Sequence, residues 1–155
     1  MLTHVNEKKL PAMVDVSAKT STKREATAES RVILPEETLR LLRDGEISTA
    51  KGPVFNTAII AGVMAVKRTS ELIPFCHPIP LENCQITIEV ENKKLVVITC
   101  TAMTTGKTGV EMEALTGATV AALTVYDMCK SMSHNITIKE TRLLSKRGGK
   151  SDFLS

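Results

Sequence analysis

The sequence predicts an α+β fold of the ferredoxin-like kind, with one antiparallel sheet, helices packed on one face of it, and assembly into an oligomer. Strand-like and helix-like segments follow one another in the order β-α-β-β-α-β, which is the split βαβ pattern. The two main helices are apolar over more surface than one sheet face can cover, so part of each is expected to pack on another subunit. A chain of 155 residues supplies one core and needs no second domain.

The chain begins with an expected extended arm, residues 1–23, in which Lys, Ser, Thr and Asp surround a short apolar patch. A strand follows over 24–34 and ends at Pro35. Pro35 and the two acids after it open a short helix, since acids suit the positive N-terminal end of a helix. We expect this helix to stop at Asp44-Gly45.

The next segments are an apolar helix and a stiff loop. Gly52-Pro53 starts a helix over 54–68 whose apolar residues lie on every side, so we expect it to be buried all round. Residues 72–81, LIPFCHPIPL, contain three prolines that remove backbone donors and disfavour helix in the residues before them. This segment is therefore expected to be an irregular, rigid loop.

The last third of the chain predicts a hairpin, a long helix and a final strand. Two β-branched runs over 85–90 and 95–101 flank a polar turn, which is typical of a hairpin. The long helix is expected over 110–132 and the last strand over 136–144. The expected organisation is an N-terminal arm over 1–23, a single domain over 24–145 and a flexible basic tail over 146–155.

Composition argues against several classes of function. No Trp, one Tyr and three Phe leave few rings on which bases could stack, so no nucleic-acid partner is expected. The longest apolar run is nine residues, far below the ~20 needed to cross a bilayer. Without CxxC spacing or a secretory signal, we expect reduced thiols in the cytoplasm. A basic run near the C-terminus fits a solvated tail first, a clamp on a phosphorylated ligand second and a nucleic-acid contact third: Lys139, Arg142, Lys146, Arg147 and Lys150.

The stretch 106–130 carries charges only near its two ends, with Lys107, Glu111 and Glu113 at one end and Asp127 and Lys130 at the other. Charges at the rim of an otherwise apolar helix indicate a site more than a solvated face.

Within this stretch, Gly106-Lys107-Thr108 resembles the end of a phosphate-binding P-loop, but the required earlier glycine is Thr101. The weaker expectation that remains is an affinity for some anion near Lys107.

Spacing along this helix bears on how many chains build the site. Asp127 and Lys130 lie three residues apart on one helical face, which permits either proton exchange with a shared ligand or a plain salt bridge. Glu113 and Asp127 are separated by about 21 Å along the axis, too far to grip one small molecule together. We therefore hypothesise an antiparallel pairing of this helix with its own copy, crossing near Val120.

Two further residues are candidates on weaker grounds. His77 lies between prolines that fix its backbone, so it suits a positioned donor or acid–base group, although a lone His is more often structural and Cys76-His77 alone is poor evidence for zinc. Lys51 precedes a helix start, where its charge opposes the helix dipole and an anionic ligand would relieve the conflict.

With these residues identified, the chain resembles the molybdenum-cofactor biosynthesis protein C family, the cyclic pyranopterin monophosphate synthases, over essentially its whole length. The stretches that carry the resemblance are MVDVSAK (13–19), KREA (23–26), KGPVF with TAIIAG (51–62), KRTSELIPFCHPIPL (67–81), KTGVEMEALT (107–116), AALTVYDMCK (121–130) and RLLSKRGGKS (142–151). The resemblance implies a ferredoxin-like subunit, a homohexamer arranged as a trimer of dimers, and active sites at subunit interfaces. The implied reaction is a rearranging lyase step that converts 3',8-cyclo-7,8-dihydro-GTP, made by a partner radical enzyme, into cyclic pyranopterin monophosphate and pyrophosphate.

Residue by residue, the resemblance implies that Asp127, Lys130 and Lys51 are catalytic. It implies substrate contacts at Phe75, Cys76, His77, Met112, Glu113 and Glu111, and basic positions near the triphosphate at Lys19, Arg24, Lys146 and Lys150. No metal-ligating cluster and no resident cofactor are expected, while the sequence leaves open whether Mg²⁺ accompanies the triphosphate.

The rival interpretations are a ferredoxin-like nucleotide-binding regulatory module without catalysis, and an anion-binding scaffold whose tail recruits nucleic acid.

Overall fold

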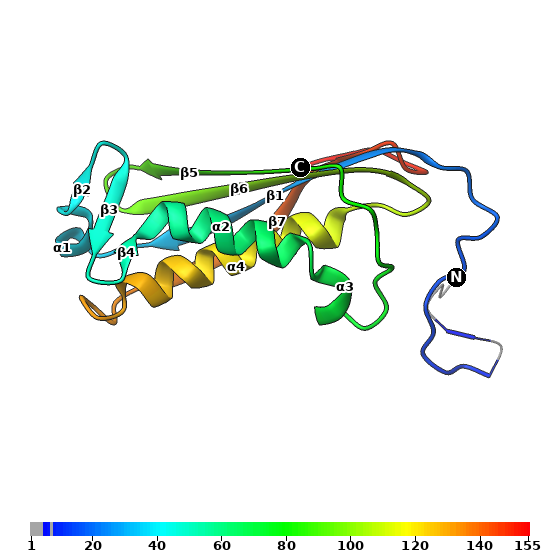
Figure 1. Ribbon diagram of the computed structural model, residues 1–155, viewed down its shortest axis with the longest axis horizontal. Helices are drawn as coiled ribbons and strands as arrows, with labels where there is room; N and C mark the ends of the chain where they lie inside the picture. The colour runs from blue at the N-terminus through cyan, green and yellow to red at the C-terminus, as the bar shows by residue number, and fades with distance from the viewer. Residues whose placement is uncertain (1–4, 7) are drawn as a thin grey trace.

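The computed structural model describes residues 5, 6 and 8–155 of the chain, and it has an antiparallel sheet covered by two long helices (Figure 1). The elements of the described residues are β1 Thr22–Ile33, α1 Glu36–Leu39, β2 Leu42–Arg43, β3 Glu46–Thr49, β4 Gly52–Pro53, α2 Val54–Val66, α3 Thr69–Leu72, β5 Asn83–Glu91, β6 Leu95–Gly106, α4 Glu111–Cys129, β7 Thr137–Arg147 and β8 Phe153–Leu154. The mixed α+β class and the antiparallel sheet predicted from the sequence are confirmed.

The main sheet has the strand order β5-β6-β1-β7-β8 in the described part of the chain, and every neighbouring pair is antiparallel. β1 lies in the centre because it pairs over its full length with β6, from Thr22 opposite Gly106 to Ile33 opposite Leu95. The hairpin of β5 and β6 closes over three residues, two of which, Asn92 and Lys93, adopt positive φ. β1 and β6 thus bring the arm and the turn before α4 to the same end of the sheet.

The helices α2 and α4 lie on one face of the sheet (Figure 1). Alternate residues of β1 and β6 point toward them, since side chains of a strand alternate between faces, and Ala28, Val32 and Ile98 are fully buried there. α4 contributes small buried residues, Ala118 and Ala122 among them, which let the helix approach the sheet closely. Burial of each larger aliphatic side chain in this layer stabilises the fold by about 1.5–3 kcal/mol.

Two glycines permit the close contact between α2 and α4. A Cβ on Gly62 would lie 2.5 Å from Ile86 Cδ1 and 3.0 Å from the Gly117 carbonyl oxygen. A Cβ on Gly117 would lie 2.5 Å from Val66 Cγ2 and 2.6 Å from Cys100 Sγ. Both positions therefore require glycine for packing, and the distance between the two helices is set by them.

The structure corrects two expectations about the first half of the chain. The helix opened by Pro35 ends at Leu39, because Asp44 and Gly45 both have positive φ and form a two-residue turn that joins β2 to β3. Such a turn is the commonest hairpin connection and Asp-Gly is one of its preferred sequences, so the sequence contained the signal. The prediction of a single helix running to Asp44-Gly45 was wrong.

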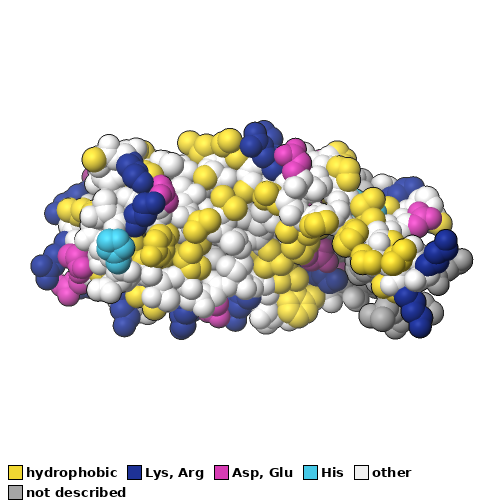
Figure 2. Space-filling model, turned by 90° about the horizontal axis from the view of Figure 1, so that it is seen from below, with side chains coloured by type: hydrophobic (Ala, Val, Ile, Leu, Met, Phe, Trp, Pro, Cys, Tyr) yellow, Lys and Arg dark blue, Asp and Glu magenta, His cyan; other side chains and the backbone are white. Residues whose placement is uncertain are grey.

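The expectation that the helix over 54–68 is buried all round is also wrong for the single chain. α2 buries Val54, Ala58 and Val66, whereas Ile60 is 62% exposed and Met64 is 49% exposed. Leu123 of α4 is likewise 57% exposed on the helical layer. Figure 2, which looks at the molecule from below, shows hydrophobic side chains gathered on that side of the molecule.

No helix of the described residues is long and apolar enough to cross a membrane.

Candidate active site at the two ends of helix α4

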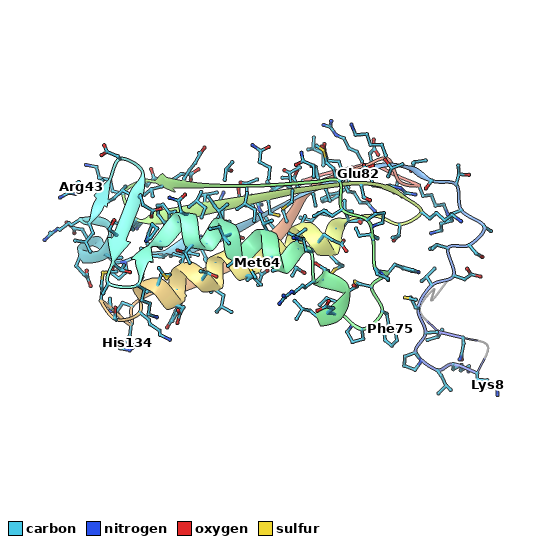
Figure 3. The ribbon with its side chains drawn as sticks, in the orientation of Figure 1. Lys8, Arg43, Met64, Phe75, Glu82 and His134 are labelled. Carbon is cyan, nitrogen blue, oxygen red and sulfur yellow. The ribbon has the colours of Figure 1, made fainter. Side chains whose placement is uncertain are left out.

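A cleft of about 390 Å³ lies at the N-terminal end of α4. It is bordered by the arm, by the proline-rich loop before β5, and by the first turn of α4; Phe75 of the loop is labelled in Figure 3. The lining residues are Val14, Val16, Lys19, Phe75, Cys76, His77, Thr108, Gly109, Glu111, Met112 and Glu113. Seven of the ten residues implied to contact substrate therefore face one cavity.

The loop that carries Phe75, Cys76 and His77 contains no helix or strand between α3 and β5, as its prolines predicted. His77 is held by the arm, because its Nε2 lies 2.8 Å from the carbonyl oxygen of Val14. A carbonyl only accepts, so Nε2 carries a hydrogen and donates it. In the neutral ring Nδ1 is then the acceptor, which leaves His77 able to take a proton at that nitrogen.

Glu113 is the buried acid of the cleft, with 4% of its surface exposed. Burial raises the pKa of Glu113, the hydrogen bond from its own backbone N–H opposes this, and the nearby charge of Glu111 raises it further. Burial, followed by the charge of Glu113, also raises the pKa of the Cys76 thiol. Cys76 is therefore a neutral thiol at neutral pH, which suits a contact residue and not a nucleophile.

A basic hollow of about 200 Å³ adjoins the cleft and shares Lys19, Thr108, Gly109 and Glu111 with it. Its residues are Lys19, Arg24, Glu25, Lys107, Thr108, Gly109, Glu111, Lys146, Arg147, Gly149 and Lys150. Lys146 Nζ lies 3.1 Å from Glu111 Oε1. The Nε of Arg24 is buried without a hydrogen-bond partner in the described chain. An unsatisfied guanidinium N–H among several lysines favours an anionic ligand in this hollow.

The C-terminal segment forms one wall of the basic hollow. Gly148 adopts φ +81°, and a Cβ there would lie 1.8 Å from the Lys23 carbonyl oxygen, so only glycine allows this approach to β1. Thr22 Oγ1 donates to the Gly148 carbonyl at 2.7 Å, and the Gly148 N–H donates to Asp152 Oδ1 at 3.1 Å. These contacts bring Lys150 beside Arg24.

The three residues implied to be catalytic form an ion-pair cluster at the other end of α4, near the turn that carries His134 in Figure 3. Lys130 Nζ lies 2.7 Å from Asp127 Oδ1. Lys51 Nζ lies 3.0 Å from Asp127 Oδ2 and donates to the Asp127 main-chain carbonyl at 3.0 Å. Asp127 thus links the end of α4 to the turn before α2.

The start of α2 is positioned by Glu46, which sequence reasoning did not single out. Its carboxylate accepts from the N–H groups of Phe55 at 2.8 Å and Asn56 at 3.0 Å, and from Ile47 at 2.7 Å. A carboxylate at a helix N-terminus satisfies free donors and complements the helix dipole. This cap sets the place of the turn that carries Lys51.

The ion pairs hold both partners of the cluster in their charged forms. Hydrogen bonds from Lys130 and then from Lys51 lower the pKa of Asp127, and the hydrogen bond to Asp127 raises the pKa of Lys130. The side chains are 45–53% exposed, so the ion pairs and not burial set the pKa values of Asp127 and Lys130 in the single chain. Asp127 therefore stays a carboxylate and Lys130 an ammonium, and the same ion pairs make Asp127 a weaker base and Lys130 a weaker acid than either would be alone.

The structure thus separates the candidate residues into two groups. The ten implied to contact substrate line the cleft or the basic hollow, while Lys51, Asp127 and Lys130 lie at the opposite end of a 19-residue helix. Sequence reasoning missed Val14 and Val16 as lining residues, although their alternation with polar neighbours in the arm was a signal for one-sided burial. No three His, Cys, Asp or Glu side chains gather as a metal site within the described ranges.

Fold and site together define a class, an α+β protein with clustered acidic and basic side chains and a basic hollow beside a cleft. Comparison with known proteins gives the family. The model of the MoaC family matches residues 13–149, which include both ends of α4, and the chain belongs to this family.

Close relatives carry consistent names. The chain is 57% identical over 152 residues to the cyclic pyranopterin monophosphate synthase of Xanthomonas oryzae pv. oryzae, covering 98% of this chain and 92% of the relative. It is 55% identical over 153 residues to the protein of the same name from Brevibacillus brevis, covering 98% and 94%. It is also 52% identical to molybdenum cofactor biosynthesis protein 1 of Dictyostelium discoideum, over 92% of this chain and 25% of that longer protein.

Proposed function

We propose that this chain is an enzyme of molybdenum cofactor biosynthesis that forms cyclic pyranopterin monophosphate and pyrophosphate from 3',8-cyclo-7,8-dihydro-GTP. The observation that carries this proposal is the family match over 13–149, supported by relatives at 55–57% identity over nearly the whole chain. The alternative of a regulatory module without catalysis is disfavoured, because those relatives are named as synthases.

The basic hollow is the proposed seat of the triphosphate. Arg24 and the lysines of the arm and tail surround a cavity that is too small for the whole substrate but adjoins the cleft, where the base-derived ring system would lie. The Lys146–Glu111 pair opens when phosphate replaces the carboxylate as partner of Lys146. Cations at this position also offset the negative charge that develops as pyrophosphate leaves.

The remaining chemistry consists of proton transfers. Opening a dihydropurine ring, forming the pterin and closing the cyclic phosphate each move protons. Asp127, as a carboxylate, is the acceptor and Lys130, as an ammonium, is the donor, once the substrate has loosened the ion pairs that oppose both transfers. His77 serves at Nδ1, since Nε2 is occupied by the arm. Lys51 stabilises the ionised Asp127 and supplies a further positive charge. The reaction as proposed needs no resident metal or cofactor.

We also propose that the subunit is ferredoxin-like and forms a homohexamer, a trimer of dimers, with each active site shared by two subunits. The order β5-β6-β1-β7 of the four long strands, with α2 and α4 as the crossover helices, fits that fold. The exposed Ile60, Met64 and Leu123 offer an apolar face for the dimer. An antiparallel pairing of α4 with its copy would place the ion-pair cluster of one subunit at the cleft of the other.

A cytoplasmic enzyme that receives its substrate from a partner radical enzyme completes the proposal. The free thiols of Cys76, Cys84, Cys100 and Cys129 are compatible with that compartment.

The decisive experiment incubates the purified protein with the cyclic dihydro-GTP intermediate and follows pterin product by fluorescence after oxidation, together with released pyrophosphate. Stoichiometric formation of both supports the proposal. A folded protein that binds the intermediate without converting it would instead support the regulatory module.

A further inference from the structure

The arm segment 13–19 lines the cleft through Val14, Val16 and Lys19, and within the described part of the chain the hydrogen bonds that join it to the domain come from two side chains. His77 Nε2 donates to the carbonyl of Val14 at 2.8 Å, and Lys107 Nζ donates to the carbonyl of Ser17 at 2.7 Å. His77 belongs to the proline-rich loop that lines the cleft, whereas Lys107 belongs to the turn between β6 and α4 and lines the basic hollow.

Packing alone holds this segment weakly. Val14 and Val16 turn half-buried side chains into the cleft, while Asp15, Ser17 and Lys19 are exposed. The other hydrogen bonds of the segment are local: Ser17 N–H donates to Asp15 Oδ1 at 2.8 Å and Lys19 N–H donates to the Val16 carbonyl at 3.0 Å. These bonds shape a turn before Lys19 but do not attach it to the domain.

Lys107 is the lysine whose surroundings resemble a P-loop in the sequence. The structure gives its ammonium group a different partner, a main-chain carbonyl of the arm, although the residue also borders the basic hollow. Because the acceptor is backbone, the contact sets the path of the arm independently of the arm's side chains. Two residues beyond that carbonyl, Lys19 reaches both the cleft and the basic hollow.

We propose that Lys107 is a positioning residue that fastens the arm over the cleft and so holds Lys19 at the boundary between the two cavities. The segment 13–19 then acts as a strap. When it is released from Lys107 it uncovers the cleft, and when it is fastened it closes the cleft and adds Lys19 to the other basic side chains of the hollow. His77 supports the other end of the strap from the site itself. This inference rests on the proposed function for the identity of the ligand, but the fastening of the strap does not.

Hydrogen exchange of the arm tests the fastening without any turnover. In Lys107→Gln, the amides of Ser17 and Lys19 should exchange about five- to tenfold faster, since a hydrogen bond with a charged donor is lost. Lys107→Arg retains a charged donor and should restore most of the protection. The matched control is Lys146→Gln, which removes one positive charge from the same hollow, because the ammonium of Lys146 pairs with Glu111 and not with the arm.

Kinetics then separates positioning from direct catalysis. Lys107→Gln should raise KM for the cyclic dihydro-GTP intermediate about tenfold with a smaller change in kcat, because an unfastened strap presents Lys19 only part of the time. Unchanged arm exchange in Lys107→Gln, or an equal increase in Lys146→Gln, would overturn the proposal. Because exchange is measured on the resting protein, that result is distinct from failure of the proposed function, which would appear as no turnover in the unaltered chain.

Discussion

The two ends of α4 each carry a carboxyl group, and the fold shifts their pKa values in opposite directions. At the N-terminal end Glu113 is buried in the cleft wall and its pKa is raised. At the C-terminal end Asp127 is half exposed between two lysines and its pKa is lowered. One end therefore has a group that resists ionisation, and the other has a group that holds its charge.

This contrast shows that the residue type alone does not define an acid–base role. Desolvation dominates where the helix start is covered by the loop, and charge-assisted hydrogen bonds dominate where the helix end meets Lys51. A site that contained both ends would bring an acid with a raised pKa and a carboxylate with a lowered pKa to one ligand, and groups whose pKa values are pushed apart in this way are the arrangement that general acid–base chemistry uses.

The largest effect is expected from single substitutions at the C-terminal end. Asp127→Asn and Lys51→Ala should each lower kcat about 100-fold or more, because the proposed proton acceptor or the cation proposed to support it is lost. Product formation from the cyclic dihydro-GTP intermediate is measured, with circular dichroism as the check of folding. A well-folded variant with near-normal turnover would remove that residue from the catalytic group.

Mixing two inactive variants tests whether the ends act across subunits. Glu113→Gln and Asp127→Asn, co-expressed in equal amounts with different affinity tags, should recover about a quarter of the wild-type activity. Half of the dimers are mixed, and each mixed dimer has one site with both residues intact. If each site were built from one chain, the mixture would stay as inactive as its components.

The packing between the two helices keeps the two ends in place. Gly62→Ala should lower the free energy of unfolding by about 2 kcal/mol, because the added methyl meets Ile86 and the Gly117 carbonyl. The control is Gly106→Ala, where the nearest atom would be 3.8 Å away and the change should stay within about 0.5 kcal/mol. Urea unfolding measures both. Equal stability of the two variants would show that α2 and α4 shift apart without cost.

The smallest effect is a pH dependence of stability that has opposite signs at the two ends. The pKa of Glu113 is raised in the folded state, so between pH 4.5 and the folded pKa the native protein binds more protons than the unfolded chain. The free energy of unfolding therefore falls as pH rises through this range. Glu113→Gln removes this fall and should be about 1 kcal/mol more stable than wild type at pH 7, with the difference vanishing below pH 4.

The control for this measurement is Asp127→Asn. The pKa of Asp127 is lowered in the folded state, so its contribution is present above the ordinary value of 3.8 and is lost as pH falls through the folded value. The variant should therefore lose, not gain, a small amount of stability at pH 7. Urea midpoints between pH 3.5 and 7 that shift in the same direction for both variants would contradict the comparison.

Much of the fold was predictable because it depends on local patterns. Alternating apolar residues marked β1 and the β5–β6 hairpin, and an uncharged stretch marked α4. The missed hairpin of β2 and β3 was also local, since Asp44-Gly45 is a favoured turn sequence that was assigned to a helix end. The predicted boundaries of β1, β6 and β7 fell short by two to five residues, because strand pairing extends beyond the apolar core.

The sequence by itself also determined which residues carry charge at each end of α4, and it indicated by helix geometry that these ends are far apart. The tertiary structure decided what each charge does. Lys107 reaches a carbonyl 90 positions away, Lys51 reaches Asp127 over 76 positions, and His77 reaches the arm over 63. Periodicity and turn chemistry are encoded among neighbours along the chain, whereas desolvation and hydrogen-bond partners depend on segments that meet only after folding.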